Sequence, residues 1–173
     1  AKMGYVEKTL GNGEKIEHIV NFHWLWMFFA YLFLTVGSVL AIVAFLYVPE
    51  LLSQKNMDSA WVHLIPFFSF VVGLSVYLSM MIKKWTTERV LTDIRFIKKT
   101  GWIMRQTEEI RIDRMEEINL DQSVLGRLFD YGDVKISGMG MGGIVLSMID
   151  SPIDFQKRLN DLKVQYFQQT GNP

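Results

Sequence analysis

The chain has 173 residues, no cysteine, and 18 basic against 18 acidic residues, so its formal net charge is zero. The lack of cysteine excludes disulfides and thiolate chemistry, and the balanced charge lacks the basic excess of a nucleic-acid-binding domain. A chain of this length has room for one helical hairpin and one small domain of about 90 residues.

Two long uncharged stretches occupy residues 24–48 and 61–82. Their one side chain that titrates near neutral pH is His63. About 20 consecutive apolar residues are enough to cross a hydrocarbon core about 30 Å thick. The pattern therefore predicts a transmembrane hairpin over residues 22–84, with residues 49–60 as its outer loop.

The positions of Lys and Arg predict the orientation of this hairpin. The outer loop carries one basic residue, Lys55, whereas Lys83 and Lys84 begin a basic run directly after the second stretch. Residues 1–21 add three lysines, and they lack the basic start and cleavage site of a signal peptide. Because positive residues concentrate on the cytoplasmic side, we expect a multi-pass protein whose two termini are both cytoplasmic.

Small residues on both stretches indicate how the hairpin packs. Gly37 and Ala41 share one helical face of the first stretch, and Ser69 and Gly73 form a small-xxx-small pair on the second. Such faces let helix backbones approach closely in a membrane, either within the hairpin or between neighbouring subunits. Neither stretch contains Asp or Glu, so no proton relay or ion pathway is indicated.

After residue 84 the apolar period changes from helical to twofold, which is typical of strands. Alternating or β-prone runs occur at residues 109–113, 117–121, 134–137 and 144–148. Thr100 and Gly101 are interpreted as the turn of a further hairpin, which joins residues 95–99 to residues 102–105. Several short strands with closely spaced turns predict an antiparallel sheet that closes toward a barrel or sandwich.

A short helix is predicted to interrupt the strands. Ser123 is a suitable N-cap for a helix that ends at Leu128 or Phe129. We expect Leu125, Leu128 and Phe129 to be buried against the sheet. We expect Arg127 to pair with an acidic neighbour, for which the candidates are Glu116, Glu117 and Asp130.

A longer helix is predicted near the end of the chain. Ser151 is the expected N-cap, and Pro152 occupies the first helical position. Apolar residues from Phe155 to Tyr166 recur at spacings of four, three and four, which is typical of an amphipathic helix with one core-facing stripe. Residues 169–173 are interpreted as a frayed tail.

Three segments of the cytoplasmic part carry recognisable motifs, namely LTDIRFI at residues 91–97, IRIDRM at residues 110–115 and QSVLGRLFDYGDV at residues 122–134. They resemble the bacterial pleckstrin-homology (PH) domain membrane proteins, and GEKI at residues 13–16 resembles family members with an N-terminal membrane hairpin. The resemblance covers nearly the whole chain. It implies a PH-like fold over residues 85–168, in which a partly open barrel is plugged at one end by the C-terminal helix.

The third of these motifs is the most specific. Gly126 and Gly132 flank the short helix and are expected to permit the tight backbone turns that it needs. We therefore expect the motif to be mainly structural rather than a binding site. The residues that match the family pattern are Gln122, Ser123, Gly126, Arg127, Tyr131 and Gly132.

Charge is segregated along the cytoplasmic part. Residues 83–105 contain seven basic and two acidic residues, whereas residues 108–133 contain three basic and eight acidic ones. Anionic lipids attract juxtamembrane basic residues, which suggests that the basic run holds the domain against the inner leaflet while the acidic part faces a partner. The alternative is a topology signal with a solvated surface. The lipid candidates are Lys83, Lys84, Arg95, Lys98, Lys99 and Arg105.

No catalytic or metal-binding constellation is visible in the sequence. Residues 138–143 formally match G-x-G-x-x-G, but a strand-like run follows them where a phosphate-binding loop would open a helix. We interpret these residues as a mobile hairpin loop. All three histidines precede residue 64, which excludes a Ser-His-Asp triad within the cytoplasmic part. We expect no enzyme activity, no cofactor, no metal and no small-molecule substrate.

These observations predict an α+β protein of the bacterial inner membrane, with a two-helix hairpin followed by a PH-like domain. The main hypothesis is a non-enzymatic scaffold that presents this domain to protein partners at the cytoplasmic face, with self-association through the small-residue face or an open sheet edge. A second hypothesis is a binder or sensor of anionic lipid headgroups. A third is an accessory subunit of a membrane enzyme or transporter.

Overall fold

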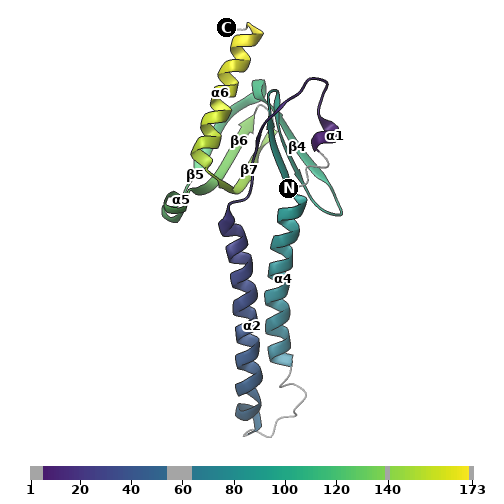
Figure 1. The fold of residues 1–173 in the computed structure, drawn as a ribbon, viewed down its shortest axis with the longest axis vertical. Helices are drawn as coiled ribbons and strands as arrows, with labels where there is room; N and C mark the ends of the chain where they lie inside the picture. Colours follow the sequence, from purple (N-terminus) through teal and green to yellow (C-terminus); the bar gives the residue numbers. More distant parts are fainter. Residues whose placement is uncertain (1–5, 54–63, 139–140, 172–173) are drawn as a thin grey trace. The chain divides into compact units, whose positions relative to one another are not determined.

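The computed structural model describes residues 6–53, 64–138 and 141–171 (Figure 1). It divides into two compact units. The first, called the domain below, combines Ala1–Trp24 with Lys83–Pro173, and the second, called the hairpin, is Leu25–Ile82. The hairpin is thus inserted into the sequence of the domain.

The hairpin consists of two long apolar helices, α2 (Trp24–Ser53) and α4 (Leu64–Thr86). The mean hydropathy of an 18-residue window is 2.4 within Trp24–Glu50 of α2 and 2.0 within α4, so both helices are long and apolar enough to cross a membrane. Helix α2 continues through the first residues of the predicted outer loop. Residues 54–63, including His63, lie outside the described residues.

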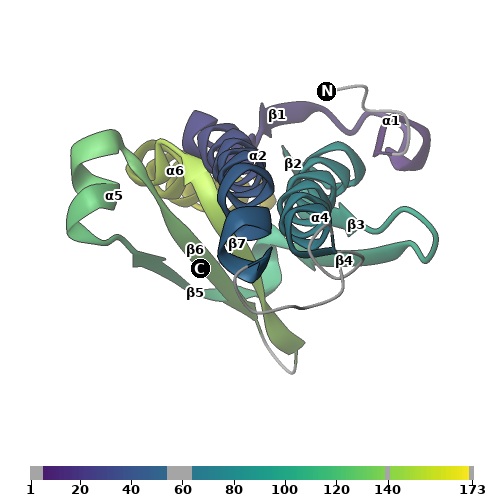
Figure 2. The ribbon, with the colours of Figure 1, turned by 90° about the horizontal axis from the view of Figure 1, so that it is seen from below.

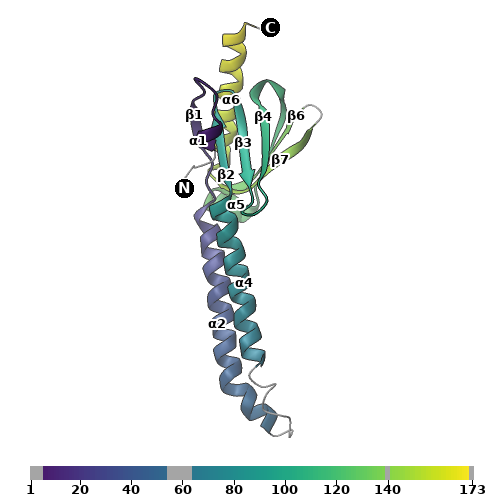
Figure 3. The ribbon, with the colours of Figure 1, turned by 90° about the vertical axis from the view of Figure 1, so that its right-hand side faces the viewer.

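Glycines bring α2 and α4 into close contact, and the two helices run side by side in Figures 1 and 3. A Cβ added at Gly37 would lie 2.9 Å from the Cα of Gly73, and one added at Gly73 would lie 3.0 Å from the Cα of Gly37. The Ser69 hydroxyl donates to the Gly37 carbonyl at 3.3 Å. Three of the four predicted packing residues therefore meet within the hairpin, and the fourth, Ala41, lies one turn further along α2, half-buried.

The domain contains two antiparallel sheets (Figure 2). The first has the order β1-β2-β3-β4 and the second the order β5-β6-β7. The strands of the first sheet are β1 (Ile16–Ile19), β2 (Glu88–Thr92), β3 (Arg95–Thr100) and β4 (Gln106–Arg111). A 3-10 turn, η1 (Ile112–Arg114), leads to the second sheet, which contains β5 (Met115–Asp121), β6 (Tyr131–Gly138) and β7 (Met141–Asp150). The two sheets do not close into a barrel, so the barrel part of the sequence prediction is wrong.

One apolar core lies between the sheets and helix α6 (Pro152–Thr170). The two-residue period of a strand puts one set of side chains on the inner face of each sheet. Phe155 and Leu159 of α6 are 1% and 0% exposed, so the helix fills the space that a closed barrel would enclose. The fully buried members of this core include Leu91, Phe96, Ile112, Val134, Ile136, Leu146 and Ile149.

The outer face of the first sheet is covered by the N-terminal segment. Helix α1 (Val6–Thr9) places Val6 against Val90 and Ile97, and all three side chains are fully buried. Strand β1 then pairs with β2, so that Ile19 lies opposite Val90. Neither α1 nor β1 was predicted from the sequence, because four-residue segments without turn signals give too little periodicity to recognise.

Two expected strand features differ from the structure. Residues 101–105 form the turn between β3 and β4 and are not a strand, although they include Trp102, Ile103 and Met104. Gly101 has φ +96°, a conformation that favours glycine, and a Cβ there would overlap the Met104 carbonyl. The loop interpretation of residues 138–143 is partly wrong, because Gly138 ends β6 and residues 141–143 begin β7, while residues 139–140 are outside the described part.

The short helix forms as predicted but packs differently. Helix α5 (Val124–Phe129) begins after Ser123, whose side chain accepts a hydrogen bond from the Gly126 amide. Leu125, Leu128 and Phe129 are 59%, 74% and 41% exposed, so the prediction that they are buried against the sheet is wrong. A six-residue helix that crosses the end of a sheet has no second layer to cover it.

Candidate functional site

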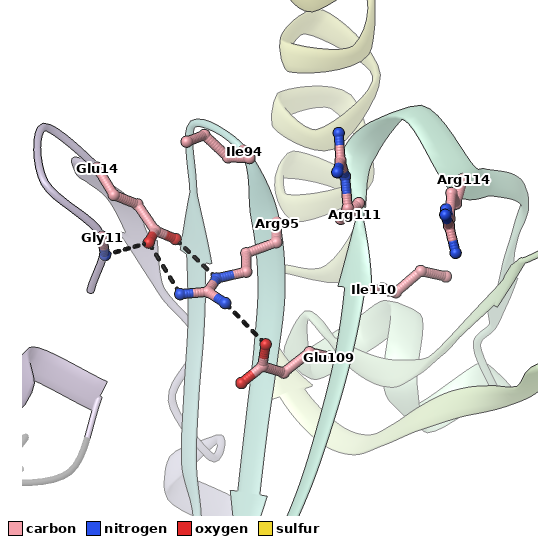
Figure 4. A pocket seen from close by; sticks show the side chains of 8 residues that line it. All are labelled: Gly11, Glu14, Ile94, Arg95, Glu109, Ile110, Arg111 and Arg114. Atoms are coloured by element: carbon pink, nitrogen blue, oxygen red, sulfur yellow. Dashed lines mark hydrogen bonds and ion pairs between the residues drawn. The ribbon is translucent and has the colours of Figure 1, made fainter. Parts of the chain in front are cut away.

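A pocket of about 520 Å³, lined largely by charged side chains, opens on the first sheet (Figure 4). It combines the N-terminal segment with strands β3 and β4 and the turn that follows them. Its lining residues are Gly11, Glu14, Ile94, Arg95, Glu109, Ile110, Arg111 and Arg114.

Arg95 is the centre of this pocket and is held on both sides by carboxylates. Its Nε and Nη2 atoms donate to the two oxygens of Glu14 at 3.0 and 2.9 Å. Its Nη1 atom donates to Glu109 at 2.9 Å, and Nη2 also reaches the Thr9 carbonyl. The guanidinium therefore joins the N-terminal segment to β3 and β4.

The Glu14 carboxylate is almost fully enclosed, with a side-chain exposure of 3%. Burial acts to raise its pKa, but hydrogen bonds from Arg95, Gly11 and Thr92 and the positive charge of Arg95 outweigh burial, so the pKa lies below its ordinary value. The Arg95 pKa is raised in turn by Glu14 and Glu109. Both groups remain ionised at neutral pH.

This pair cannot act as an acid–base catalyst near pH 7, because neither partner exchanges a proton there. Arg111 is occupied by Asp113 at 3.0 Å and Tyr166 at 3.5 Å. Among residues 6–53, 64–138 and 141–171, no group of three or more His, Cys, Asp or Glu side chains is placed to hold a metal ion. The pocket is therefore best explained as a structural connection.

Three of the six predicted lipid-binding residues, Arg95, Lys98 and Lys99, form ion pairs with acids. Lys98 contacts Glu108 at 2.8 Å, and Lys99 contacts Glu88 at 3.4 Å. These pairs follow from the antiparallel register, which sets Lys98 opposite Glu108 and Lys99 opposite Glu88. The basic run and part of the acidic run therefore lie on neighbouring strands and neutralise each other.

The other basic candidates occupy the ends of elements. Lys83 is exposed and Lys84 half-buried in the last turn of α4. Arg105 is exposed in the turn between β3 and β4. The structure thus brings Arg95, Lys98 and Lys99 together on one strand, with their charges compensated, and leaves Arg105 outside that group.

The motif around α5 forms a closed set of local hydrogen bonds. The Gln122 amide donates to the carbonyls of Gly126 and Tyr131 at 3.1 and 3.2 Å. A Cβ at Gly126 would lie 2.6 Å from the Tyr131 carbonyl, and one at Gly132 would lie 3.0 Å from the Asp121 carbonyl. Both glycines are therefore required for close backbone approach rather than for a left-handed turn. The left-handed residue that ends α5 is Asp130, with φ 55°.

Arg127 belongs to the motif, but its side chain takes no part in these local hydrogen bonds and is exposed on α5. Within the described part of the chain no ion pair joins it to Glu116, Glu117 or Asp130. The predicted pairing of Arg127 is therefore wrong. Asp130 instead accepts a hydrogen bond from the Ser151 hydroxyl, so Ser151 precedes α6 without capping it through its side chain.

The two points at which the chain leaves and re-enters the domain are adjacent. The Val20 amide, shortly before α2, donates to the carbonyl of Arg89, shortly after α4, at 3.0 Å. Phe22 forms a bridge with Ile149 of β7, and the His23 amide donates to the Met148 carbonyl at 2.9 Å. These contacts tie the segment before α2 to both sheets.

Arg89 is buried at this junction, with an exposure of 5%. Its guanidinium lies 3.8 Å from the centre of the Phe22 ring, and Nη1 donates to the Ser147 carbonyl at 3.1 Å. Burial lowers its pKa to about 10, against an opposing effect of Asp133. In the sequence Arg89 is only one of the basic residues between 83 and 105, since nothing in the local sequence indicates that it is buried.

Comparison of the sequence with protein families identifies one family that matches the chain. The family model described as "Bacterial PH domain" matches residues 19–163, most of the chain. The match includes the hairpin and strands β2 to β7, and it confirms the resemblance inferred from the sequence motifs. No curated protein and no solved structure matches the chain.

Proposed function

The chain belongs to the bacterial PH domain family, and from this premise we propose that it is a non-enzymatic, membrane-anchored module that binds protein partners at the cytoplasmic face of the bacterial inner membrane. PH domains in general bind lipids or proteins. In this proposal α2 and α4 are transmembrane spans, and both termini are cytoplasmic.

One observation carries the anchoring part of the proposal. The hydrogen bond between Val20 and Arg89 holds the segment that leads into α2 beside the strand that follows α4, within one domain. A single folded domain lies on one side of a membrane, so a chain that leaves it through α2 and returns through α4 must cross an even number of times. The hydropathy and length of both helices fit two crossings.

Protein partners are favoured over lipid headgroups because the lysines of β3 already form ion pairs with acids. An anion that bound Lys98 or Lys99 would have to displace Glu108 or Glu88. Lys99 and Glu88 are only 11% and 9% exposed, which leaves little room for a headgroup. The headgroup-sensor hypothesis is therefore the second choice, and an accessory subunit is one form that the protein-binding function could take.

The absence of cysteine from the sequence allows topology to be tested with single-cysteine variants. Ser53→Cys lies at the end of α2, and Asn160→Cys is exposed on α6. In intact cells or spheroplasts, a membrane-impermeant maleimide should label Ser53→Cys, and it should label Asn160→Cys only after lysis. Labelling of Asn160→Cys before lysis, or purification of the chain without detergent, would contradict anchoring with cytoplasmic termini.

Native mass spectrometry in a mild detergent separates the two binding hypotheses. A stoichiometric protein partner or a discrete oligomer supports the scaffold. Co-purification of anionic lipid that is lost when Lys98 and Lys99 are both changed to Glu supports the headgroup sensor instead. The matched control is Lys157→Glu, which changes an exposed charge on α6 instead of one on β3.

A further inference from the structure

Two exposed apolar segments of the domain are explained neither by its core nor by the charged pocket. The first is the turn between β3 and β4, where Trp102, Ile103 and Met104 are 71%, 87% and 85% exposed. The second is α5, where Val124 and Leu128 are 82% and 74% exposed. We call these two segments together the apolar rim. Clusters of exposed apolar side chains that the rest of a domain leaves uncovered mark contact with a partner or a membrane.

The register of the strands places the turn near the end of α4. Thr100 pairs with Gln106 at the turn, and the neighbouring Lys99 pairs with Glu88, the first residue of β2. Strand β2 begins two residues after α4 ends at Thr86. The turn between β3 and β4 therefore lies at the same end of the first sheet as the start of β2, which is the strand that follows α4.

Ring contacts place α5 near the start of α2. The Trp24 and Phe129 rings are 6.2 Å apart in an edge-on arrangement, and the His23 ring is 5.5 Å from that of Tyr131. The carbonyl of Asn21 accepts the Asp150 amide, which holds this segment against the end of β7. Both parts of the rim lie at the same end of the domain in Figures 1 and 3.

The composition of the rim fits the interface of an anionic lipid bilayer. Residues 101–105 and α5 together contain apolar residues, glycine and two arginines, Arg105 and Arg127, and no acidic residue. Trp and Leu side chains partition into the boundary between headgroups and acyl chains, where an Arg side chain reaches the phosphates.

From this placement and composition we infer that the apolar rim is an interfacial membrane-binding surface, which inserts into the headgroup–acyl boundary of the bilayer that the hairpin spans. The inference rests on the proposed anchoring by α2 and α4. It adds that the domain is not suspended freely from the hairpin but is held against the lipid by its own side chains. The face formed by α6 and the distal parts of the sheets then remains available to protein partners.

Depth-dependent fluorescence quenching tests the inference in the full-length chain. An environment-sensitive fluorophore is attached to Ile103→Cys or to Leu128→Cys in protein reconstituted into vesicles of equal parts phosphatidylcholine and phosphatidylglycerol. Lipids carry a spin-label quencher either near the headgroup or at the end of the acyl chain. Both variants replace side chains that are more than 70% exposed, so the fold is retained.

Two reference positions define the scale. Val39→Cys, exposed in the middle of α2, reports the bilayer interior, and Asn160→Cys on α6 reports a position away from the rim. We expect Ile103→Cys and Leu128→Cys to lose fluorescence strongly with the shallow quencher and less with the deep one. Val39→Cys should show the opposite order, and Asn160→Cys should be affected by neither.

The outcomes separate this inference from the proposal on which it rests. If Val39→Cys is quenched while Ile103→Cys or Leu128→Cys behaves like Asn160→Cys, the hairpin is anchored and the inference about the rim is overturned. If Val39→Cys itself is not quenched, anchoring by the hairpin fails, and the inference fails with it. Shallow quenching at both rim positions supports both.

Discussion

Arg95 on β3 is joined by two hydrogen bonds to Glu14, which precedes it by 81 residues in the sequence. The whole hairpin lies between these two residues in the chain. Glu14 also accepts hydrogen bonds from Thr92 and from the Gly11 amide, at 2.8 Å each. The N-terminal segment is therefore fixed to the sheet by a pair of charges as well as by the pairing of β1 with β2.

Glu14→Gln should destabilise the domain because it removes the bidentate partner of Arg95. Loss of one partner from a buried ion pair costs about 3–5 kcal/mol, but the Arg95 side chain is 24% exposed and water compensates part of the loss. We expect the unfolding free energy to fall by about 2 kcal/mol. Hydrogen exchange of the β2 and β3 amides in the detergent-solubilised chain measures this change.

Asp113→Asn is the matched control for that experiment. It removes the partner of Arg111, an ion pair at 3.0 Å in which the arginine side chain is 53% exposed. Pairs in such positions contribute at most about 1 kcal/mol. Equal effects of Glu14→Gln and Asp113→Asn would contradict the assignment of Glu14 as a structural connection.

Elements that are defined by local pattern were predictable from the sequence. The long apolar stretches became α2 and α4, Ser123 begins α5, and Pro152 begins α6. In each case the signal lies within the element itself, in the form of length, capping chemistry or a helical period. The strands were likewise predictable from the local alternation of apolar and polar residues. Whether the sheets close into a barrel was not predictable in this way.

Features that depend on distant residues were not predictable. Strand β1 is recognisable only beside β2, which follows it in the chain after the whole hairpin. The opposite charges of the 83–105 and 108–133 segments suggested two separate surfaces, whereas the register pairs Lys98 with Glu108. Leu128 was predicted to be buried because it is apolar, but its exposure depends on whether distant parts of the chain cover α5, which the local sequence does not indicate.

His18 on β1 should make the stability of the domain depend on pH below neutrality. The imidazole is half-buried beside the Phe155 ring, and burial together with the positive charge of Arg158 lowers its pKa from the ordinary 6.5. Above pH 6.5 the imidazole is neutral in both the folded and the unfolded chain, and its contribution to stability is fully present. As the pH falls from 6.5 toward the lower pKa of the folded state, the unfolded chain binds the proton first, so the unfolding free energy decreases.

His18→Gln should remove the part of this decrease that occurs just below pH 6.5. Unfolding temperatures of the solubilised chain, measured at closely spaced pH values, give the slope. Glu14→Gln is the complementary variant, since the lowered pKa of Glu14 contributes stability that is lost only at acid pH below its ordinary value of 4.5. A His18→Gln variant that keeps the full slope between neutrality and that lower range would contradict the assignment.

Gly37→Leu should separate the two helices of the hairpin. Even a Cβ at this position would lie 2.9 Å from the Gly73 Cα and 3.3 Å from the Ser69 carbonyl, and both are backbone atoms that cannot rotate away. The Tyr31 and Tyr77 rings are 5.5 Å apart in the parent hairpin. Cysteines at these two positions should therefore be joined efficiently by a short bifunctional maleimide, and Gly37→Leu should strongly reduce the yield.

Val36→Leu provides the control, because it adds bulk at the neighbouring residue, whose side chain is 47% exposed. It should leave the yield of cross-linked hairpin unchanged. If both variants reduced cross-linking equally, the effect would arise from added volume in general. Close packing at Gly37 and Gly73 would then not be what holds the hairpin together.

Replacement of residues 24–86 by a flexible linker should give a folded domain that needs no detergent. The adjacent positions of Val20 and Arg89 mean that the two cut ends already lie at neighbouring strands. A Gly/Ser linker of about 10 residues spans roughly 17 Å on average and adds little closure entropy. The shortened chain should elute from gel filtration as a compact species, with its β1 and β2 amides protected from hydrogen exchange.

The apolar rim should cause the shortened chain to self-associate, because without lipid its apolar side chains are exposed to water. Changing Trp102, Ile103 and Leu128 to Ser in the shortened chain should reduce self-association without loss of amide protection, since all three side chains are at least 71% exposed. A second variant that replaces residues 16–19 with Gly and Ser removes strand β1, and it should lose protection in β2. If the β1 amides were unprotected in the shortened chain that carries the three Ser substitutions, the hairpin, rather than the sheet, would hold the N-terminal segment in place.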